Sequence, residues 1–283
     1  MSRCAAAWAG CVAHRPGVCA STARAHAGVR IAASRRIRLH CAKQPPYSRR
    51  PRHLHSLTAS VVGAQQVRGA PAVAPANLAV FVSGGGSNFR AIQEACAAGV
   101  IKGRVAVVVT NAPQCGGAQY AERLGIPVLV YPSSKSAKGC TPDELVAALR
   151  EEHGVDYVVL AGYLKLIPPQ LVRAFPRAML NIHPGLLPAF GGSGLYGLRV
   201  HSAVITSGAR LSGPTVHFVD EGYDTGPILA QVSVAVSPLD SPQQLAARVL
   251  AEEHKLYPRC VAALCEGRIS WREDGIPIMW TAA

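Results

Sequence analysis

From about Asn77 onward, the hydrophobic positions of the 283-residue chain follow two alternating periods. Runs of consecutive apolar residues, typical of strands buried on both faces, occur at Leu78–Val82, Val105–Val109, Val128–Tyr131, Tyr157–Ala161, Met179–His183, Thr215–Val219 and Ile228–Val236. Segments with helical spacing lie between and after them: one ending at Ala98, then Gly117–Leu124, Pro142–His153, Pro168–Ala174, Leu198–Ser207, and a long one from Ser241 toward Leu256. This alternation predicts one Rossmann-like α/β domain with a mostly parallel central sheet and helices on both faces.

The first 75 residues lack this pattern. They are rich in Ala and Arg, contain the basic runs Arg35–Arg38 and Arg49–Arg52, and include no Asp or Glu. A basic, acid-free segment with few bulky apolar residues is typical of an organellar transit peptide. We therefore predict a disordered transit peptide over residues 1–75, cleaved near Val67–Asn77, and a folded domain over residues 76–283. The chloroplast is the expected destination, with the mitochondrion or dual import as alternatives.

The net charge of +13 is concentrated before the first acidic residue, Glu94. Thirteen Lys and Arg residues precede Glu94, whereas 16 Lys and Arg and 16 Asp and Glu occupy the rest of the chain, which therefore sums to zero. A basic nucleic-acid-binding domain needs its charge on the folded part. We accordingly predict no nucleic-acid partner.

Cysteine usage gives no sign of a metal site or a disulfide framework. Five cysteines lie in the predicted domain, at Cys96, Cys115, Cys140, Cys260 and Cys265, with no CxxC pair. Their odd number and scattered spacing are typical of reduced cysteines in an interior compartment. No stretch approaches 18 consecutive apolar residues, so the sequence predicts no transmembrane helix and no membrane partner.

A glycine-rich motif, SGGGSN at Ser83–Asn88, follows the first predicted strand and opens a helix. Backbone N–H groups at such a helix start can hold a phosphate, and glycines let the backbone approach it closely. The motif misses the third glycine of the dinucleotide fingerprint, and Thr110–Asn111, after the second strand, supplies no acid for a ribose. The motif therefore favours phosphate binding, with a tight structural turn as the alternative.

Three later segments carry polar side chains suited to chemistry. Asn181 and His183 share one side of the strand that ends at His183, where ligands of open α/β sheets bind, and an amide beside an imidazole can polarise a carbonyl. A carboxylate from the loop Asp220–Asp224 would raise the pKa of a histidine that it reaches. Glu253, late in the long helix, can accept hydrogen bonds from ribose hydroxyls. Taken singly, these segments also fit core polar groups, a solvated turn and a solvated helix face.

Together, and in this order, SGGGSN, Val159–Tyr163, NIHPGLLP, HFVDEGYDTGPI and EEHKLYP resemble phosphoribosylglycinamide formyltransferase, a folate-dependent enzyme of purine synthesis. The resemblance runs from Leu78 to about Ile269. The Asn-x-His-Pro element with its distant Asp marks the wider formyltransferase superfamily, and SGGGSN with EEHKLYP favours the purine enzyme. The resemblance implies a formyltransferase domain that moves the formyl group of 10-formyltetrahydrofolate to the amine of glycinamide ribonucleotide, on the route to IMP. The amine attacks directly, without a covalent enzyme intermediate.

The resemblance also implies the roles of individual residues. Asn181 donates a hydrogen bond to the formyl oxygen as it becomes an oxyanion, and His183, held protonated by Asp224, stabilises that charge and moves the proton. The ribonucleotide contacts are implied at Gly86, Ser87, Asn88 and Glu253. The folate contacts are implied at Leu164, Lys165, Leu166, Ile167, Asn181, Asp220, Glu221, Gly222, Tyr223 and Asp224. The folate is a cosubstrate, and no metal or tightly bound prosthetic group is implied. Both monomer and homodimer remain open.

Several positions depart from the bacterial pattern of the family. Gly185 stands where Ser is common, which suggests a looser loop, and Leu250 stands where a polar ribonucleotide contact can occur. The segment Cys140–Asp143 has no counterpart of a folate-side Arg, and the loop Ala189–Gly197 is longer and richer in glycine. These departures bear on substrate affinity and loop closure rather than on the reaction.

Other functions are compatible with parts of the sequence. A formyltetrahydrofolate deformylase uses a similar trio with water as acceptor, but it carries an N-terminal regulatory domain that an acid-free leader does not match. Methionyl-tRNA formyltransferase needs a C-terminal extension, and only about 15 residues follow Gly267. A catalytically inactive binding module of the same fold is disfavoured by the intact Asn181, His183 and Asp224. A basic nucleic-acid-binding protein is disfavoured by the zero net charge of the chain from Glu94 onward.

Overall fold

The computed structural model describes residues 74–132 and 140–281, so the predicted transit peptide lies outside the described residues. The elements are β1 (Ala76–Val82), α1 (Ser87–Ala97), β2 (Gly103–Thr110), α2 (Gly116–Arg123), β3 (Val128–Val130), α3 (Pro142–Ala147), the π-helical turn η1 (Ala148–Glu152), β4 (Tyr157–Leu160), α4 (Pro169–Ala174), β5 (Met179–His183), α5 (Leu198–Ser207), β6 (Leu211–Ser212), β7 (Thr215–Phe218), β8 (Ile228–Gln231), β9 (Val234–Ala235), α6 (Pro242–Cys265), β10 (Ile269–Trp271) and β11 (Pro277–Met279). No helix in these ranges is long and apolar enough to cross a membrane.

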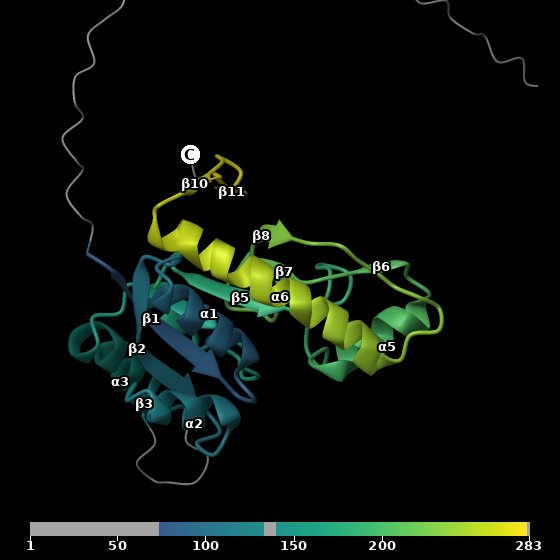
Figure 1. Ribbon diagram of the computed structural model, residues 1–283. Coiled ribbons are helices and arrows are strands. Elements are labelled where there is room, and N and C mark those ends of the chain that lie inside the picture. Colours follow the sequence, from purple (N-terminus) through teal and green to yellow (C-terminus); the bar gives the residue numbers. More distant parts are fainter. Residues whose placement is uncertain (1–73, 133–139, 282–283) are drawn as a thin grey trace, which may run out of the picture. The chain divides into compact units, whose positions relative to one another are not determined.

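Seven strands form one sheet in the order β3-β2-β1-β4-β5-β7-β8 (Figure 1). The pairs from β3 to β5 are parallel, whereas β7 runs antiparallel to β5 and β8 antiparallel to β7. The prediction of a mostly parallel sheet is therefore confirmed. β5 lies at the boundary between the parallel and antiparallel halves, so its carboxyl end is bordered by structure from both.

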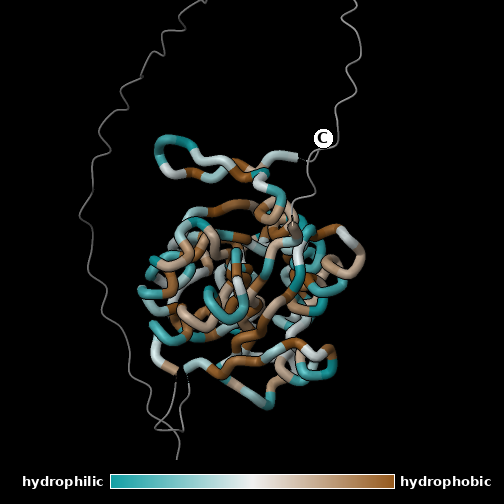
Figure 2. Tube along the Cα trace, turned by 90° about the vertical axis from the view of Figure 1, so that its left-hand side faces the viewer, coloured by the Kyte–Doolittle hydropathy of each residue, from teal (hydrophilic) through white to brown (hydrophobic). Residues whose placement is uncertain are grey.

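Strand β1 shows how the sheet buries both faces. Leu78, Val80 and Val82 belong to a core that also contains side chains of α1, α2 and α6, whereas Ala79 and Phe81 belong to a second core with side chains of α3, η1 and α4. Successive side chains of a strand point to opposite faces, so a continuous apolar run is buried only when helices cover both. Apolar segments accordingly lie at the centre of the described body (Figure 2).

Helix α6 begins as the sequence predicts but ends much later. The Ser241 side chain accepts a hydrogen bond from the Gln244 backbone N–H, and the Gln244 side chain accepts one from the Ser241 backbone N–H. Pro242 occupies the first turn. The predicted end near Leu256 is wrong, because the helix continues through Pro258 to Cys265. Pro258 removes one backbone hydrogen bond, and the buried apolar side chains of the following turns offset that loss by packing on the sheet.

Three other expectations need correction. The predicted strand Ile228–Val236 is two strands, β8 in the main sheet and β9 paired with β6. The predicted helix Pro142–His153 changes from α3 to the π-helical turn η1. The hairpin of β10 and β11 was not predicted, since three-residue strands carry too little periodicity to be recognised.

Tyr257 joins α6 to the middle of the sheet. It is fully buried, and its hydroxyl is shared between the backbone carbonyls of Leu160, 2.9 Å away on β4, and Leu180, 3.0 Å away on β5. A buried hydroxyl must keep a partner, because an unmet hydrogen bond in an apolar core is costly. The contact therefore fixes α6 against the two strands whose ends carry the site described below.

Removing this hydroxyl should destabilise the fold. We expect Tyr257→Phe to lower the free energy of unfolding by about 1–2 kcal/mol, because the O–H donor is lost while the ring is kept. Tyr120→Phe is a matched control, since the Tyr120 hydroxyl makes no hydrogen bond with the described residues. Urea unfolding followed by circular dichroism measures both variants, and equal stability of Tyr257→Phe and wild type would contradict the assigned role.

Candidate active site

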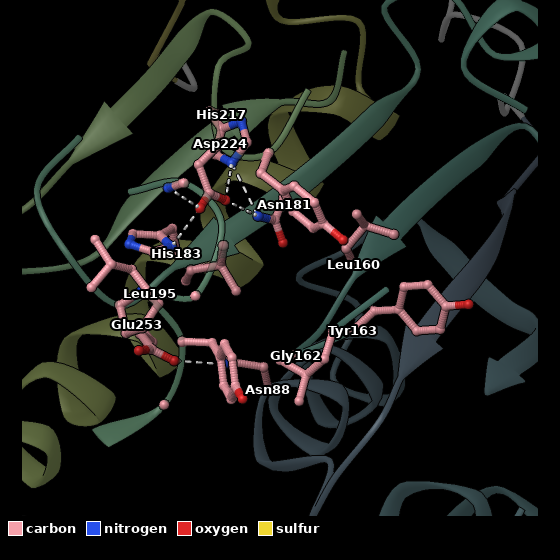
Figure 3. A pocket seen from close by; sticks show the side chains of 18 of the residues that line it. Asn88, Leu160, Gly162, Tyr163, Asn181, His183, Leu195, His217, Asp224 and Glu253 are labelled. Atoms are coloured by element: carbon pink, nitrogen blue, oxygen red, sulfur yellow. Dashed lines mark hydrogen bonds and ion pairs between the residues drawn. The ribbon is translucent and has the colours of Figure 1, made fainter. Parts of the chain in front are cut away.

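A cavity of about 690 Å³ opens at the carboxyl ends of β4 and β5, between α6 and the loops that follow β5 and β7 (Figure 3). It brings together most of the residues singled out in the sequence: Asn88, Leu164, Lys165, Leu166, Ile167, Asn181, His183, Gly222, Tyr223, Asp224 and Glu253. Four others, Gly86, Ser87, Asp220 and Glu221, are not among the lining residues. Segments that are far apart in the sequence thus largely meet at one cavity.

Asp224 is the centre of the polar part of the cavity (Figure 3). Its Oδ2 lies 3.3 Å from Nδ1 of His183 and accepts a hydrogen bond from the Gly192 backbone at 3.0 Å. Its Oδ1 lies 3.4 Å from Nδ2 of Asn181 and 3.6 Å from Nε2 of His217. The predicted meeting of a loop carboxylate with the histidine is therefore confirmed.

The backbone of Asp224 adopts φ 56°, in the left-handed region. Non-glycine residues rarely adopt this conformation, although Asp tolerates it better than most. In this conformation the carboxylate meets four nitrogen-bearing groups at once. Local strain of this kind is found mainly where the surrounding contacts enforce it, as they do at functional sites.

The surroundings of Asp224 favour its ionised form. Burial alone would raise the pKa of the carboxyl group, but the neighbouring His217, His183 and Gly192 N–H together outweigh it. The pKa of Asp224 is therefore lowered from its ordinary value. An ionised carboxylate is available to stabilise positive charge on either neighbouring imidazole.

His183 differs from the expectation in its resting charge. Its side chain is 4% exposed, and burial lowers its pKa more than Asp224 and the Phe190 carbonyl raise it. This balance runs against the prediction that Asp224 holds His183 protonated, because desolvation disfavours the cation more than one carboxylate at 3.3 Å favours it. Nε2 of His183 lies 2.7 Å from the carbonyl oxygen of Phe190, and Nδ1 faces the Asp224 carboxylate. Both neighbours are hydrogen-bond acceptors, so a doubly protonated imidazolium could donate to each of them.

His217 completes the cluster; it is the first residue of the HFVDEGYDTGPI motif, but no role was predicted for it. It is 2% exposed and pairs with Asn181 in the β5–β7 register. Its Nδ1 lies 2.8 Å from the Phe218 carbonyl, which makes Nδ1 the protonated nitrogen and Nε2 the acceptor for Asn181 Nδ2 at 3.0 Å. Only the strand register brings the two residues together, so no sequence signal marks this contact.

The amide of Asn181 is turned toward these neighbours. Its Nδ2 donates to His217 and approaches Asp224, which leaves its oxygen as the free end. The predicted donation to a formyl oxygen requires a half-turn of the amide, which exchanges the NH₂ and oxygen positions without moving the backbone. The role predicted for Asn181 thus stays a prediction.

The glycine-rich loop packs against the start of α2. Gly86 adopts φ 73° at the N-cap of α1, and a Cβ there would lie 2.7 Å from the Gly117 Cα. Only glycine combines this conformation with so close a backbone approach. The first turn of α1 carries no acidic residue and no side-chain cap, so its N–H groups stay available for an anion. Ser87 lies on the outer side of this turn, in a smaller pocket with Arg90 and His254.

Asn88 and Glu253 connect α1 to α6 on the cavity wall. Both are buried, and Nδ2 of Asn88 donates to Oε2 of Glu253 at 2.6 Å. Burial raises the pKa of Glu253, and this hydrogen bond only partly opposes the effect. Oε1 of Glu253 makes no hydrogen bond with the described residues and is the acceptor that remains for a ligand.

The opposite wall is apolar and unusually exposed. Leu164, Leu166 and Tyr223 are 50%, 44% and 43% exposed, and all three line the cavity. The Ser83 hydroxyl, which accepts a hydrogen bond from the Leu164 backbone at 2.9 Å, fixes the start of this wall. Exposed apolar side chains around a cavity mouth are typical of a site for a largely apolar ligand.

Two predicted loop residues serve the loop itself. Oδ1 of Asp220 accepts hydrogen bonds from the Gly222 backbone and the Thr225 hydroxyl, at 3.0 and 2.7 Å. Glu221 is exposed and forms an ion pair with Arg173 at 3.3 Å. Their side chains therefore shape the loop that carries Asp224.

Two of the departures from the bacterial pattern can be placed. Gly185 is buried, and a Cβ there would lie 2.8 Å from Cγ1 of Val200 and 3.1 Å from Nε2 of His183. The expectation that Gly185 loosens its loop is wrong, because glycine here permits close packing against the catalytic candidate. Leu250 lines the cavity, so an apolar side chain stands at that wall.

A comparison with protein-family models matches residues 76–261 to the formyl transferase family. Over 204 residues, the chain is 63% identical to the Arabidopsis thaliana protein named phosphoribosylglycinamide formyltransferase, chloroplastic, covering 71% of this chain and 70% of that protein. Both the fold and the sequence are therefore those of formyl transferases.

Solved structures give the same assignment. Glycinamide ribonucleotide transformylase 1 from Symbiobacterium toebii superimposes with a TM-score of 0.65 at 36% identity, covering 73% of this chain and 94% of that one. A formyltetrahydrofolate deformylase from Pseudomonas syringae superimposes with a TM-score of 0.63 at 25% identity, covering 73% of this chain and 66% of that one. The lower identity and coverage make the deformylase the more distant relative.

Acidification should destabilise the protein through His183. Because the pKa of His183 lies below 6.5 in the folded protein, the unfolded chain binds more protons below that pH, and the free energy of unfolding falls as the pH decreases. We expect His183→Asn to reduce the loss of melting temperature between about pH 7.5 and 5.5. His153→Asn, outside the cavity, is the control. Equal pH slopes for His183→Asn and wild type, measured by scanning calorimetry, would show that His183 is not neutral in the folded protein.

Proposed function

The chain belongs to the formyl transferase family, and we propose that it transfers the formyl group of 10-formyltetrahydrofolate to the amine of glycinamide ribonucleotide, in purine synthesis. The observation that carries the proposal is the position of Asn181, His183 and Asp224 between two different walls of one cavity. One wall offers hydrogen-bonding groups and a helix start to a ribonucleotide. The other offers apolar surface to a pterin and its aromatic extension.

The acceptor substrate fits the α1–α6 side. Its phosphate is an anion for the N-terminus of α1 at Gly86, Ser87 and Asn88, where backbone N–H groups stay available. Its ribose hydroxyls are donors for Glu253. Phosphate and ribose contacts together direct the remaining glycinamide part toward His183.

The folate fits the wall at Leu164–Ile167 and the loop Asp220–Asp224. Tyr223, Leu164 and Leu166 supply apolar surface for aromatic rings, while the loop backbone supplies donors and acceptors. The formyl group then lies over the ends of β5 and β7. In the reaction this folate is a cosubstrate.

The chemistry follows from the resting charges of the cluster. The amine nitrogen of the acceptor attacks the formyl carbon, a C–N bond forms, and the formyl oxygen becomes an oxyanion stabilised by the Asn181 amide. Neutral His183 accepts the proton that the attacking nitrogen loses, and ionised Asp224 stabilises the imidazolium. His183 then donates this proton to the departing folate nitrogen as its C–N bond breaks.

One contact must change before substrates react. Nε2 of His183 is occupied by the Phe190 carbonyl at 2.7 Å, and the Gly192 N–H is bound to Asp224. Both groups belong to the glycine-rich loop Ala189–Gly197. For His183 to exchange protons through Nε2 with a substrate, this loop has to move away from the ring.

Water as acceptor is the alternative reaction of the same cluster. A deformylase needs no ribonucleotide site, whereas this cavity contains the buried Asn88–Glu253 pair next to a free helix start. This pair favours the transferase. The similar plant protein is named chloroplastic, and together with the basic, acid-free leader this supports import into the chloroplast.

Substitutions in the cluster should greatly slow transfer without preventing folding. We expect His183→Ala and Asp224→Asn to lower kcat by about 10²–10³, because each removes a group that acts in the transition state. Absorbance of the deformylated product of 10-formyl-5,8-dideazafolate is followed with and without glycinamide ribonucleotide. Release that depends on the amine supports the transferase. Release without the amine would assign the deformylase instead, and no release would favour an inactive binding module.

The ribonucleotide wall can be tested separately. We expect Glu253→Gln to raise the KM for glycinamide ribonucleotide about tenfold, because a charge-assisted hydrogen bond to ribose becomes a neutral one. The KM for the folate should change less than about twofold. Glu252→Gln, whose carboxylate pairs with Lys255 at 2.7 Å outside the cavity lining, is the matched control. A shift confined to the folate KM would refute the assigned orientation.

A further inference from the structure

His201 is a buried titratable residue that the reaction described above does not use. It lies on α5, is 4% exposed and lines the main cavity. Buried side-chain atoms without a hydrogen-bond partner among the described residues are Asn88 Oδ1, Gln93 Oε1, His201 Nδ1, Ser212 Oγ and His254 Nε2. Of these residues, Asn88 and His201 line the main cavity.

An unpaired buried polar atom is rare and calls for an explanation. For Asn88 the explanation is its place in the ribonucleotide wall. For Nδ1 of His201, the described residues of α5, α6 and β5 offer no partner. A cavity-lining imidazole with an unmet nitrogen is suited to a bound ligand, which completes its hydrogen bonding.

The position of His201 limits which ligand that is. One turn further along the same side of α5, Val204 packs with Leu245 and Val249 of α6, so His201 faces α6 as well. The residues of α5 and α6 that line the cavity are Leu198, His201, Ala246, Ala247, Leu250 and Glu253. Among these, His201 and Glu253 alone carry hydrogen-bonding side chains.

The two polar groups of this wall, Glu253 and His201, lie along the expected position of the acceptor substrate. Glu253 is the proposed ribose contact, and His183 lines the same cavity as His201. A Cβ at Gly185 would lie 3.1 Å from Nε2 of His183 and 2.8 Å from Cγ1 of Val200, the residue before His201. The glycinamide part of the acceptor, an amide followed by the amine, has to cross from Glu253 to His183. Leu250, Ala246 and Ala247 offer it no hydrogen bond.

We propose that His201 is an acceptor-binding residue that hydrogen-bonds the amide of the glycinamide group and so directs the amine toward the formyl carbon. This inference rests on the proposed function of the cavity. A neutral imidazole has one donor and one acceptor nitrogen, and an amide likewise offers an N–H and a carbonyl. A neutral His201 imidazole also exerts no electrostatic repulsion on the nearby amine of the substrate.

The charged and titratable groups that face His201 are few among the described residues. His183 lies toward β5, Glu253 lines the α6 side of the same cavity, and Arg199 of α5 is exposed, with its guanidinium 4.9 Å from the Tyr196 ring centroid. His201 therefore acts as a hydrogen-bonding group rather than as part of an ion pair.

Calorimetric binding to the full chain tests the proposal with two ligands, glycinamide ribonucleotide and ribose 5-phosphate, which lacks the glycinamide group. We expect His201→Leu to weaken glycinamide ribonucleotide binding about tenfold and to change ribose 5-phosphate binding less than about twofold. His201→Asn should recover most of the loss, because the amide reaches as far as Nδ1 and offers both a donor and an acceptor.

Val204→Ala is the packing control, since Val204 is buried on the same side of α5 but does not line the cavity. It should lower the melting temperature and leave both affinities unchanged. Equal weakening of both ligands in His201→Leu, or the same loss in Val204→Ala, would overturn the proposal. If wild type transfers the formyl group and His201→Leu binds the ribonucleotide normally, the inference on His201 fails while the proposed function stands. If wild type transfers no formyl group, the proposed function itself fails.

Discussion

The stabilisation of one buried carboxylate, Asp224, is the constraint on which the site depends. A largely buried carboxylate is costly unless several polar groups surround it, and here four groups from three different segments do so. The end of β5 supplies Asn181 and His183, β7 supplies His217, and the loop after β5 supplies the Gly192 backbone N–H. The change from parallel to antiparallel pairing at β5 places these segments side by side.

The same carboxylate explains the charge of the histidine beside it. Desolvation keeps His183 neutral before substrates bind, yet both of its ring nitrogens face acceptors. The neutral imidazole is ready to accept a proton, and the imidazolium, once formed, has a partner on each side. Burial and hydrogen bonding therefore act in opposite directions on one group, which suits a residue that must take up and release a proton in a single turnover.

The cavity around this cluster has two unlike walls. Tyr257 holds α6 against β4 and β5, and α6 in turn presents Glu253 beside Asn88. On the facing wall, the side chains of Leu164, Leu166 and Tyr223 are exposed to the cavity and to solvent. A polar wall and an apolar wall on either side of the reacting groups keep the two substrates apart until they meet over Asp224.

The sequence by itself determined most of the elements, their order and the candidate site residues, because strand and helix periods and short motifs are local properties of the chain. It predicted Asn181, His183, Asp224 and Glu253 as site residues, which the structure brings to one cavity, and it predicted the mostly parallel sheet. It misjudged the end of α6, since the helix continues through Pro258 only because the buried side chains of the following turns pack on the rest of the fold. It assigned no role to His217 or His201, whose positions in the cavity depend on strand register and on helix packing between segments distant in the chain. The charge of His183 was likewise decided by the tertiary structure, because burial is a property of the assembled fold and not of any motif.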